Sequence, residues 1–156
     1  VLPLGRPETV LQMAECLERN EIVGILGDRR VSGDRIVRCE FLGEAADFPE
    51  GPLLLALILK APVVLFFGIY RGGSRYDGVF EPLVVSPAST DRRRRKEAVQ
   101  SGVAQYAARL EHYARLAPYN WFNFYDFWNS DASMDNTALS CSDDLRRTSA
   151  GSSAVR

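Results

Sequence analysis

The chain has 156 residues, of which 46% are hydrophobic and 25% charged, so it is long enough for one soluble domain with a real core. Its formal net charge of −1 gives no overall field that would favour a nucleic acid partner. The three cysteines (Cys16, Cys39 and Cys141) lack metal-ligand spacing, and their odd number argues against a disulfide framework, so we expect a reducing compartment and neither a metal nor another cofactor.

The first part of the chain predicts a helix, two strands and a second helix. Pro7-Glu8-Thr9 favours a helix start, because proline suits the first turn and an acid suits the helix dipole there. Residues 21–26 (EIVGIL) predict a short buried strand, and residues 36–42 predict another. Residues 52–60 predict a very apolar helix. Residues 48–52 (FPEGP) open that helix, or alternatively form a phosphate-binding loop at its start.

The second part predicts a hairpin and a long helix. Residues 62–69 (PVVLFFGI) are apolar at every position, which is typical of a strand covered on both faces. Residues 76–85 return as a strand and are expected to pair with it. Residues 91–117 predict a long helix that Pro118 ends. Its inner stripe repeats at helical spacing and comprises Val99, Val103, Tyr106, Ala107, Leu110, Tyr113 and Ala114.

The order of these elements sets the expected fold class and domain organisation. It is typical of an α/β fold in which helices pack on a mixed sheet. We expect residues 1–128 to form this domain, and residues 129–156, rich in Ser, Asp and Arg, to be a disordered polar tail. The longest apolar stretch, residues 53–69, is too interrupted for a transmembrane helix. Because the chain lacks an initiator Met and opens on VLPLG, we expect it to begin inside a larger protein.

A charged motif, Asp28-Arg29-Arg30, follows the predicted strand at residues 21–26. In α/β folds, ligand sites form where strands emerge from the sheet. An acid there can orient a donor or a hydroxyl, and an arginine can hold phosphate or stabilise an oxyanion. A polar turn with a local ion pair is the alternative, and a motif of this length does not decide between them.

Two further segments suggest contact with a membrane or a ligand. The run Arg92, Arg93, Arg94, Arg95 and Lys96 opposes the dipole at its helix start, so it indicates a patch for anionic lipid or an acidic carrier protein, or a merely solvated helix start. Residues 118–128 (PYNWFNFYDFW) are rich in large rings, with Trp121 and Trp128 as candidate membrane contacts. These rings could instead line an acyl pocket, or the segment could dock on the core and close it.

Four blocks of the sequence resemble a known family. In chain order they are residues 21–29 (EIVGILGDR), 39–56 (CEFLGEAADFPEGPLLLA), 60–72 (KAPVVLFFGIYRG) and 117–128 (APYNWFNFYDFW). Each block is weak by itself, but their order and spacing are fairly specific. From about residue 4 to residue 128, the chain resembles the C-terminal part of bacterial lipid A biosynthesis-type acyltransferases, within the lysophospholipid acyltransferase superfamily.

The resemblance implies an enzyme that moves a fatty acyl group from an acyl-carrier-protein or CoA thioester to a lipid hydroxyl or amine. It also implies the cytoplasmic face of the bacterial inner membrane, with peripheral attachment or an anchor in a missing N-terminal segment. The family's catalytic base is the His of a His-x4-Asp/Glu motif upstream of these blocks. The single histidine, His112, does not supply it, because position 117 is Ala and the chain order is wrong. We therefore expect an acyltransferase fragment that is inactive by itself.

The resemblance also suggests roles for the charged motif. In related glycerolipid acyltransferases a Phe-Pro-Glu-Gly-Thr-Arg motif ends a strand beside the catalytic site, and a helix and a Pro-Val strand follow. Residues 48–51 match by letters, but the predicted order of elements makes Gly27-Asp28-Arg29 the positional equivalent. Asp28 then takes the acidic, supporting role, and Arg29 contacts a substrate phosphate or headgroup. Arg30 and Arg71 are further candidate substrate-binding residues.

A second class of function fits the same residues. The chain could be a non-catalytic α/β domain that binds an anionic or phosphate ligand at Asp28 and Arg29, or one that contacts a membrane through its aromatic segment. A His-x4-Asp/Glu motif shortly upstream in the full gene would favour the acyltransferase over both.

Overall fold

The computed structural model describes residues 7–30, 33–85, 91–123 and 127–128, and it has the expected mixed α/β composition. In chain order the elements are α1 (Pro7–Glu18), β1 (Ile36–Phe41), β2 (Glu44–Pro49), α2 (Gly51–Ile58), β3 (Val63–Tyr70), β4 (Tyr76–Leu83), α3 (Arg92–Leu116) and a 3-10 turn, η1 (Pro118–Asn120). No helix in these ranges is long and apolar enough to cross a membrane. The predicted polar tail, residues 129–156, lies outside the described residues.

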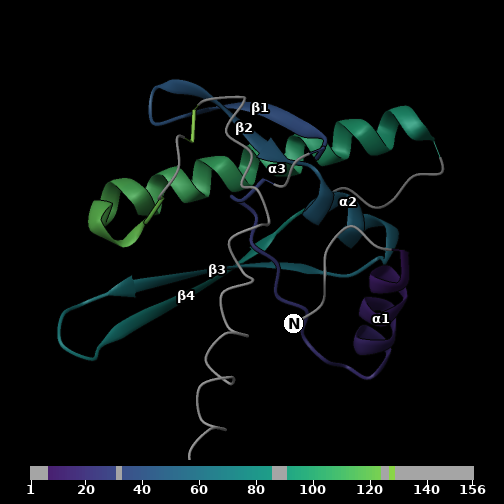
Figure 1. Cartoon of the computed structure of the whole chain (residues 1–156), viewed down its shortest axis with the longest axis horizontal. Helices are drawn as coiled ribbons and strands as arrows, with labels where there is room; N and C mark the ends of the chain where they lie inside the picture. Colours follow the sequence, from purple (N-terminus) through teal and green to yellow (C-terminus); the bar gives the residue numbers. More distant parts are fainter. Residues whose placement is uncertain (1–6, 31–32, 86–90, 124–126, 129–156) are drawn as a thin grey trace, which may run out of the picture.

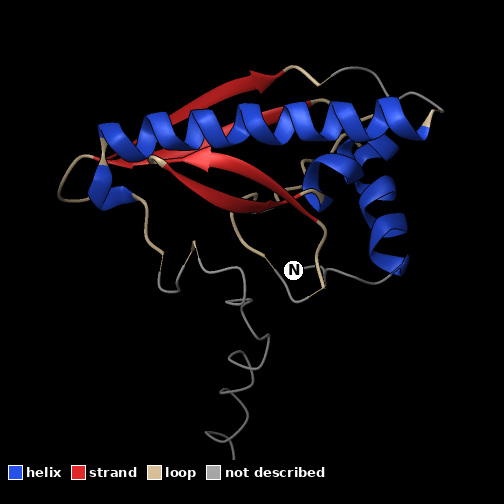
Figure 2. Cartoon of the chain, turned by 90° about the horizontal axis from the view of Figure 1, so that it is seen from above, coloured by secondary structure: helices blue, strands red, loops and turns tan. Residues whose placement is uncertain are grey.

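The long helix α3 runs the length of the molecule, and both hairpins pack against it (Figure 1). In that view β1–β2 lies above the helix and β3–β4 below it, while α1 and α2 gather near its N-terminal end. Figure 2 shows the same grouping of the helices from above. The predicted inner stripe of α3 is confirmed, since Val99, Val103, Ala107, Leu110 and Ala114 are all buried. The helix is therefore the element against which the rest of the domain packs.

The sequence predicts strand β1 but not its partner β2. The run Glu44–Pro49 carries two acids, two alanines and a proline rather than β-branched residues, so its composition does not favour a strand. The turn that joins the strands consists of Leu42 and Gly43, with φ of 56° and 93°. Two positive φ values match the right-handed twist of a hairpin. The N–H of Leu42 donates to Oε2 of Glu111 on α3 at 3.0 Å, which supports this unusual backbone conformation.

The predicted strand at residues 21–26 is wrong, because this run has no strand pairing in the structure. A strand needs a neighbour that pairs its N–H and C=O groups, and among the described residues β3 and β4 pair only with each other. The run is not buried either, since Ile22 is 97% exposed. Its apolar composition is instead explained by the cavity that it lines, which is described below.

The expected single mixed sheet is also absent from the described residues, where β1–β2 and β3–β4 form two separate antiparallel sheets. The prediction that β3 is covered on both faces is wrong. Its burial alternates, with Phe67 on the inner face and Phe66 on the outer face. This alternation is typical of an antiparallel sheet covered on one side. On the outer face, ring pairs cross the hairpin, with centroids 4.9 Å apart for Phe66–Phe80 and 5.2 Å apart for Tyr70–Tyr76.

The core is aromatic where β1, β2 and the C-terminal segment meet. Phe41 and Phe48 are fully buried, with ring centroids 5.5 Å apart in an edge-to-face arrangement. Phe127 packs on both rings at 5.4 Å, and the indole of Trp121 lies 5.0 Å from Phe41. Among the interpretations of residues 118–128, these contacts show docking on the core for Trp121, Phe127 and Trp128, whereas Tyr119 and Phe122 are exposed.

Candidate functional site

A large apolar cavity lies between residues 21–28 and the hairpin β3–β4. Its volume is about 1040 Å³, and its wall also includes residues from α1, α2 and α3. Ile22, Leu26, Phe66 and Phe80 are exposed to solvent, and all of them line this cavity. Large hydrophobic side chains that the fold leaves uncovered therefore gather around one space, which is where a small-molecule site is expected.

Gly27 and Asp28 form part of the cavity wall. A Cβ atom at Gly27 would lie 2.9 Å from the ring of Tyr106 on α3, so a larger residue would require that ring to shift. At the next position, Oδ2 of Asp28 accepts a hydrogen bond from Nε1 of Trp121 at 3.2 Å. The acid that the sequence singled out therefore lies at the cavity, in contact with the C-terminal segment.

The residue before Trp121 brings the end of β3 to the same place. Oδ1 of Asn120 accepts a hydrogen bond from the backbone N–H of Tyr70, the last residue of β3. Asn120 and Trp121 are consecutive residues, so their Cα atoms are only about 3.8 Å apart. The hydrogen bond of Asn120 to Tyr70 and that of Trp121 to Asp28 therefore hold the end of β3 near Asp28. Arg71 follows Tyr70 directly. The structure thus brings Arg71 and Asp28, distant in sequence, to the same part of the molecule.

The three arginines that the sequence analysis proposed for substrate binding have different surroundings. Arg29 is exposed, and so is Arg71, whose Nε lies 2.7 Å from Oδ2 of Asp77. Arg30 is only 7% exposed, and its Nη1 donates to Oδ2 of Asp47 on β2 at 3.4 Å. Buried charges need such a partner, because an unpaired charge in the interior is very costly. Arg29 and Arg71 therefore present their guanidinium groups to solvent, whereas Arg30 is engaged with the framework.

The Phe-Pro-Glu-Gly segment does end a strand, since β2 stops at Pro49 and α2 follows. The prediction that it only opens the helix is therefore wrong, and the order of elements no longer singles out Asp28. The side chains do. Oε1 of Glu50 lies 3.7 Å from Nη1 of Arg35 and is not part of the cavity wall, whereas Asp28 lines the cavity. The cavity therefore supports Asp28 as the acidic residue of the site.

A charged cluster that the sequence analysis missed joins α3 to β4. Nε and Nη2 of Arg109 donate to the two carboxylate oxygens of Glu81, both at 2.6 Å, and the hydroxyl of Tyr113 donates to the same group. These hydrogen bonds, that of Arg109 first, lower the pKa of Glu81 from 4.5 to about 2. Arg109 and Tyr113 are one helical turn apart, which the sequence does reveal. Their partner on the hairpin is 28 residues from Arg109, and no local pattern points to it.

The remaining predicted residues are not part of the cavity wall. His112 is exposed on α3. The basic run at Arg92–Arg95 begins that helix, and its N-cap residue Asp91 accepts the N–H of Arg93 at 2.9 Å, which offsets the unfavourable position of the cations. Trp128 packs in the aromatic core, and its buried Nε1 has no hydrogen-bond partner among the described residues. Membrane contact by the basic run or by the two tryptophans stays a prediction.

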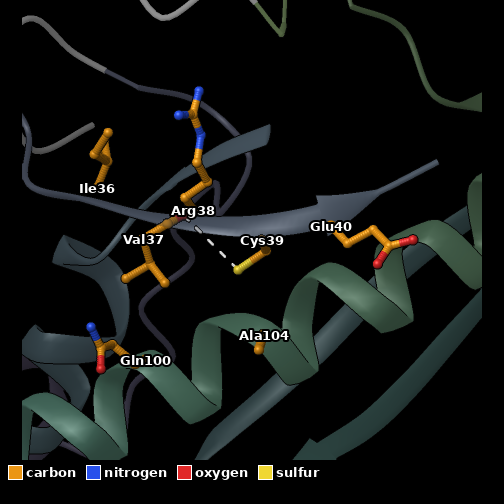
Figure 3. A pocket seen from close by; sticks show the side chains of 7 residues that line it. All are labelled: Ile36, Val37, Arg38, Cys39, Glu40, Gln100 and Ala104. Atoms are coloured by element: carbon orange, nitrogen blue, oxygen red, sulfur yellow. Dashed lines mark hydrogen bonds between the residues drawn. The ribbon is translucent and has the colours of Figure 1, made fainter. Parts of the chain in front are cut away.

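A second cavity, of about 570 Å³, lies between β1 and α3 (Figure 3). Cys39 points from β1 toward Gln100 and Ala104 of the helix, while Arg38 points away. Burial raises the pKa of the Cys39 thiol, so the nucleophilic thiolate is disfavoured. In the part of the chain that the structure describes, no group of three or more His, Cys, Asp or Glu side chains could hold a metal ion. We therefore place the candidate site at the larger cavity.

The arrangement suits an amphiphilic ligand, because an aliphatic chain fits the apolar cavity and the exposed Arg29 directly follows Asp28 of the cavity wall. The fold and the site together thus define a mixed α/β domain with a large apolar cavity. Comparison with known families goes further: residues 4–130 match the bacterial lipid A biosynthesis acyltransferases. The chain belongs to this family, which confirms the resemblance seen in the sequence and identifies the activity in general as acyl transfer. A comparison with curated proteins gives no significant match.

Proposed function

We propose that this chain takes part in moving a fatty acyl group from an acyl-carrier-protein or CoA thioester to a hydroxyl or amine of a lipid, in the synthesis of lipid A or another envelope lipid. The reaction would take place at the cytoplasmic face of the bacterial inner membrane. The family match supports acyl transfer in general. The observation that carries the proposal for this chain is the apolar cavity with Asp28 in its wall. Burying an aliphatic chain contributes roughly 0.8 kcal/mol for each CH₂ group, so such a cavity favours a long acyl chain.

In the proposed mechanism the acyl chain lies in the cavity and its thioester lies near Asp28. Arg29 and Arg71 interact with anionic groups of the donor or the acceptor, as guanidinium groups do with phosphates and carboxylates. The acceptor oxygen or nitrogen attacks the thioester carbonyl carbon, the carbon–sulfur bond breaks, and the departing thiolate receives the proton that the general base removed from the acceptor. The proposal assigns that base to a histidine outside these residues, because His112 lies on the exposed side of α3 and is not in the cavity wall.

The test is thioester-dependent acyl transfer by an enzyme that joins this chain to an upstream His-x4-Asp/Glu segment. In that enzyme, Asp28→Asn is expected to lower kcat/KM by roughly 10²-fold, as loss of a polar transition-state contact does, without changing the melting temperature. Glu50→Gln is the matched control, because Glu50 is not part of the cavity wall, and it should keep its turnover. Steady-state kinetics beside thermal melting measure both effects.

Two outcomes would contradict the proposal. The 156-residue chain by itself is expected to show no transfer, so measurable acylation by it would remove the need for an external base. Equal turnover in the Asp28→Asn and Glu50→Gln enzymes would show that the cavity acid has no part in the reaction.

A further inference from the structure

We propose that Trp121 is a positioning residue that couples occupation of the apolar cavity to the placement of the Asp28 carboxyl group. The inference rests on the proposed function, because it concerns how an acyl chain in the cavity acts on the acid of the same site. It extends that function by naming the side chain through which the two communicate.

Trp121 contacts both parts of the site. Its side chain belongs to the cavity wall, and its Nε1 donates to Oδ2 of Asp28 at 3.2 Å. A hydrogen bond weakens steeply when its geometry is distorted, and a bond to a carboxylate is among the stronger ones. A rotation of the indole therefore changes one of the interactions that position the carboxyl group. Any ligand that presses on the ring from the cavity acts on this hydrogen bond.

The other surroundings of the indole restrict its movement. Its ring lies edge to face with Phe41 at 5.0 Å and with Phe127 at 5.1 Å, and both of these phenylalanines are buried. The backbone is anchored one residue earlier, where Asn120 accepts the N–H of Tyr70. Trp121 thus packs on buried rings of the core and also takes part in the wall of the cavity. An aliphatic chain in the cavity would contact the indole and hold it against Asp28.

Trp128 offers a matched comparison in the same aromatic cluster. Its ring lies 6.1 Å from Phe41 and 5.5 Å from Phe127, so it shares the neighbours of Trp121. It is not part of the cavity wall, and its buried Nε1 has no hydrogen-bond partner among the described residues. Because the chain has only 2 tryptophans, one substitution assigns each indole N–H signal. A comparison of Trp121 with Trp128 therefore distinguishes the effect of contact with the cavity and with Asp28 from the effect of aromatic packing.

The test follows the two indole N–H signals of the full chain by proton–nitrogen NMR, assigned with Trp121→Phe and Trp128→Phe. Sodium decanoate below its micelle concentration is the probe for an aliphatic chain, and sodium acetate at the same concentration controls for its charge. Decanoate is expected to shift the Trp121 signal and to slow its exchange with water several-fold. Acetate should do neither, and the Trp128 signal should respond to neither compound.

The variant Asp28→Asn then tests whether the acid is the partner. It is expected to shift the Trp121 signal in the free chain and to abolish the slowing by decanoate, while thermal melting shows that the chain remains folded. If Asp28→Asn does not fold, Asp28→Glu replaces it, since the longer carboxylate should shift the same signal and leave that of Trp128 in place. An equal response of both tryptophans, no response to decanoate, or an unchanged Trp121 signal in the folded variant would overturn the coupling.

Kinetics of the complete enzyme distinguish a failure of the coupling from a failure of the proposed function. Trp121→Phe is expected to lower kcat more for a dodecanoyl thioester than for an acetyl thioester, because only the long chain reaches the indole. If transfer occurs but the two thioesters lose kcat equally, the coupling is wrong and the proposed function stands. If the NMR responses appear but the complete enzyme transfers no acyl group, the proposed function fails.

Discussion

Arg29 and Arg30 are neighbours in sequence but differ in what surrounds them. The guanidinium of Arg29 is in solvent, whereas that of Arg30 is buried beside Asp47 of β2. Nε of Arg38 also lies 3.2 Å from Oδ1 of Asp47, without the geometry of a hydrogen bond. The buried carboxylate is therefore compensated mainly by charge, and Arg30 is the cation most enclosed with it.

The substitutions Arg29→Ala and Arg30→Ala are expected to fail in different ways. Arg29→Ala should change the free energy of unfolding by less than about 0.5 kcal/mol, as exposed substitutions do, while lowering turnover in the complete enzyme. Arg30→Ala removes the buried partner of the Asp47 carboxylate and leaves only the more exposed Arg38 near it, so it should lower the free energy of unfolding by about 1 to 3 kcal/mol. Chemical denaturation followed by circular dichroism measures both values.

The double variant Arg30→Met with Asp47→Leu is the control for this prediction. It removes both charges and replaces them with apolar side chains, so most of the stability lost in Arg30→Ala should return. If Arg30→Ala is as stable as Arg29→Ala, the buried pair is not structural and Arg30 returns to the candidates for substrate binding.

The sequence identifies Asp28 and Arg30 as candidate site residues, but it does not reveal the side chains that bind them. The partner of Asp28, Trp121, is 93 residues away, and that of Arg30, Asp47, is 17 residues away. Residue type and local spacing indicate which side chains can do chemistry. They do not indicate which of several arginines is buried, because burial depends on elements that meet only after folding.

The hairpin β3–β4 depends on the cluster of Arg109, Glu81 and Tyr113 for its polar attachment to α3. Glu81→Gln removes the charge of this cluster, so it should lower the melting temperature at neutral pH. The pKa of Glu81 is lowered from 4.5 to about 2 in the folded chain, so the stabilisation is complete above about pH 4.5 and is lost as the pH falls toward 2. The difference in melting temperature between wild type and variant should therefore be constant near neutrality and shrink below about pH 4.5.

Thermal melting across the acid range measures this difference, and Glu97→Gln provides the control. Glu97 pairs with Arg93 at 2.9 Å on an exposed face of α3, and exposed pairs one helical turn apart contribute little. Glu97→Gln should thus leave the melting temperature nearly unchanged. A difference for Glu81→Gln that does not vary with pH would mean that the variant acts through packing rather than through its charge.

Composition predicted the helices and the hairpin β3–β4 well, and its failures have physical causes. β2 was missed because its residues have low strand propensity, and it forms because β1 and α3 bury Phe48. The composition of residues 21–26 predicts a strand wrongly, because apolar residues suit both a buried strand and the wall of a cavity. The prediction that β3 is covered on both faces is wrong for the same reason, since Phe66 and its neighbours on the outer face line that cavity.

The mixed α/β composition followed from the order of elements, whereas the central position of the long helix and the division into two small sheets did not. Pairing between strands is a long-range property, and no residue in β1 or β3 specifies that the two hairpins remain separate. The position of the cavity could not be predicted for the same reason, because its wall is assembled from α1, β2, α2, β3, β4, α3 and η1 together with the segments between and after them.

The basic run at the start of α3 leads to a prediction about membranes. Trp121 and Trp128 pack against the core, so the prediction rests on the charge of the basic run and not on insertion of these two rings. Each cation near an anionic surface contributes roughly 1 kcal/mol, so the chain should sediment with anionic vesicles at low salt and dissociate as salt rises. Replacing Arg92, Arg93 and Arg94 by glutamate should abolish this binding. Lys60→Glu, which changes one exposed cation elsewhere, should weaken it far less.

Vesicle co-sedimentation with neutral lipid as a blank decides the matter. Binding that is absent at low salt, or that is unchanged by reversal of the three arginines, would show that the run is a solvated helix start.

The turn at Leu42-Gly43 has a consequence for the order in which the chain folds. Leu42 adopts a backbone conformation that favours glycine, and the group that supports it, Glu111, is 69 residues later in the chain. During synthesis, β1 and β2 emerge long before α3, so the hairpin must wait for the helix before its turn is secured. A ribosome paused before residue 111 would therefore hold a hairpin that opens and closes, and its Phe41 and Phe48 would be exposed to chaperones until the helix arrives.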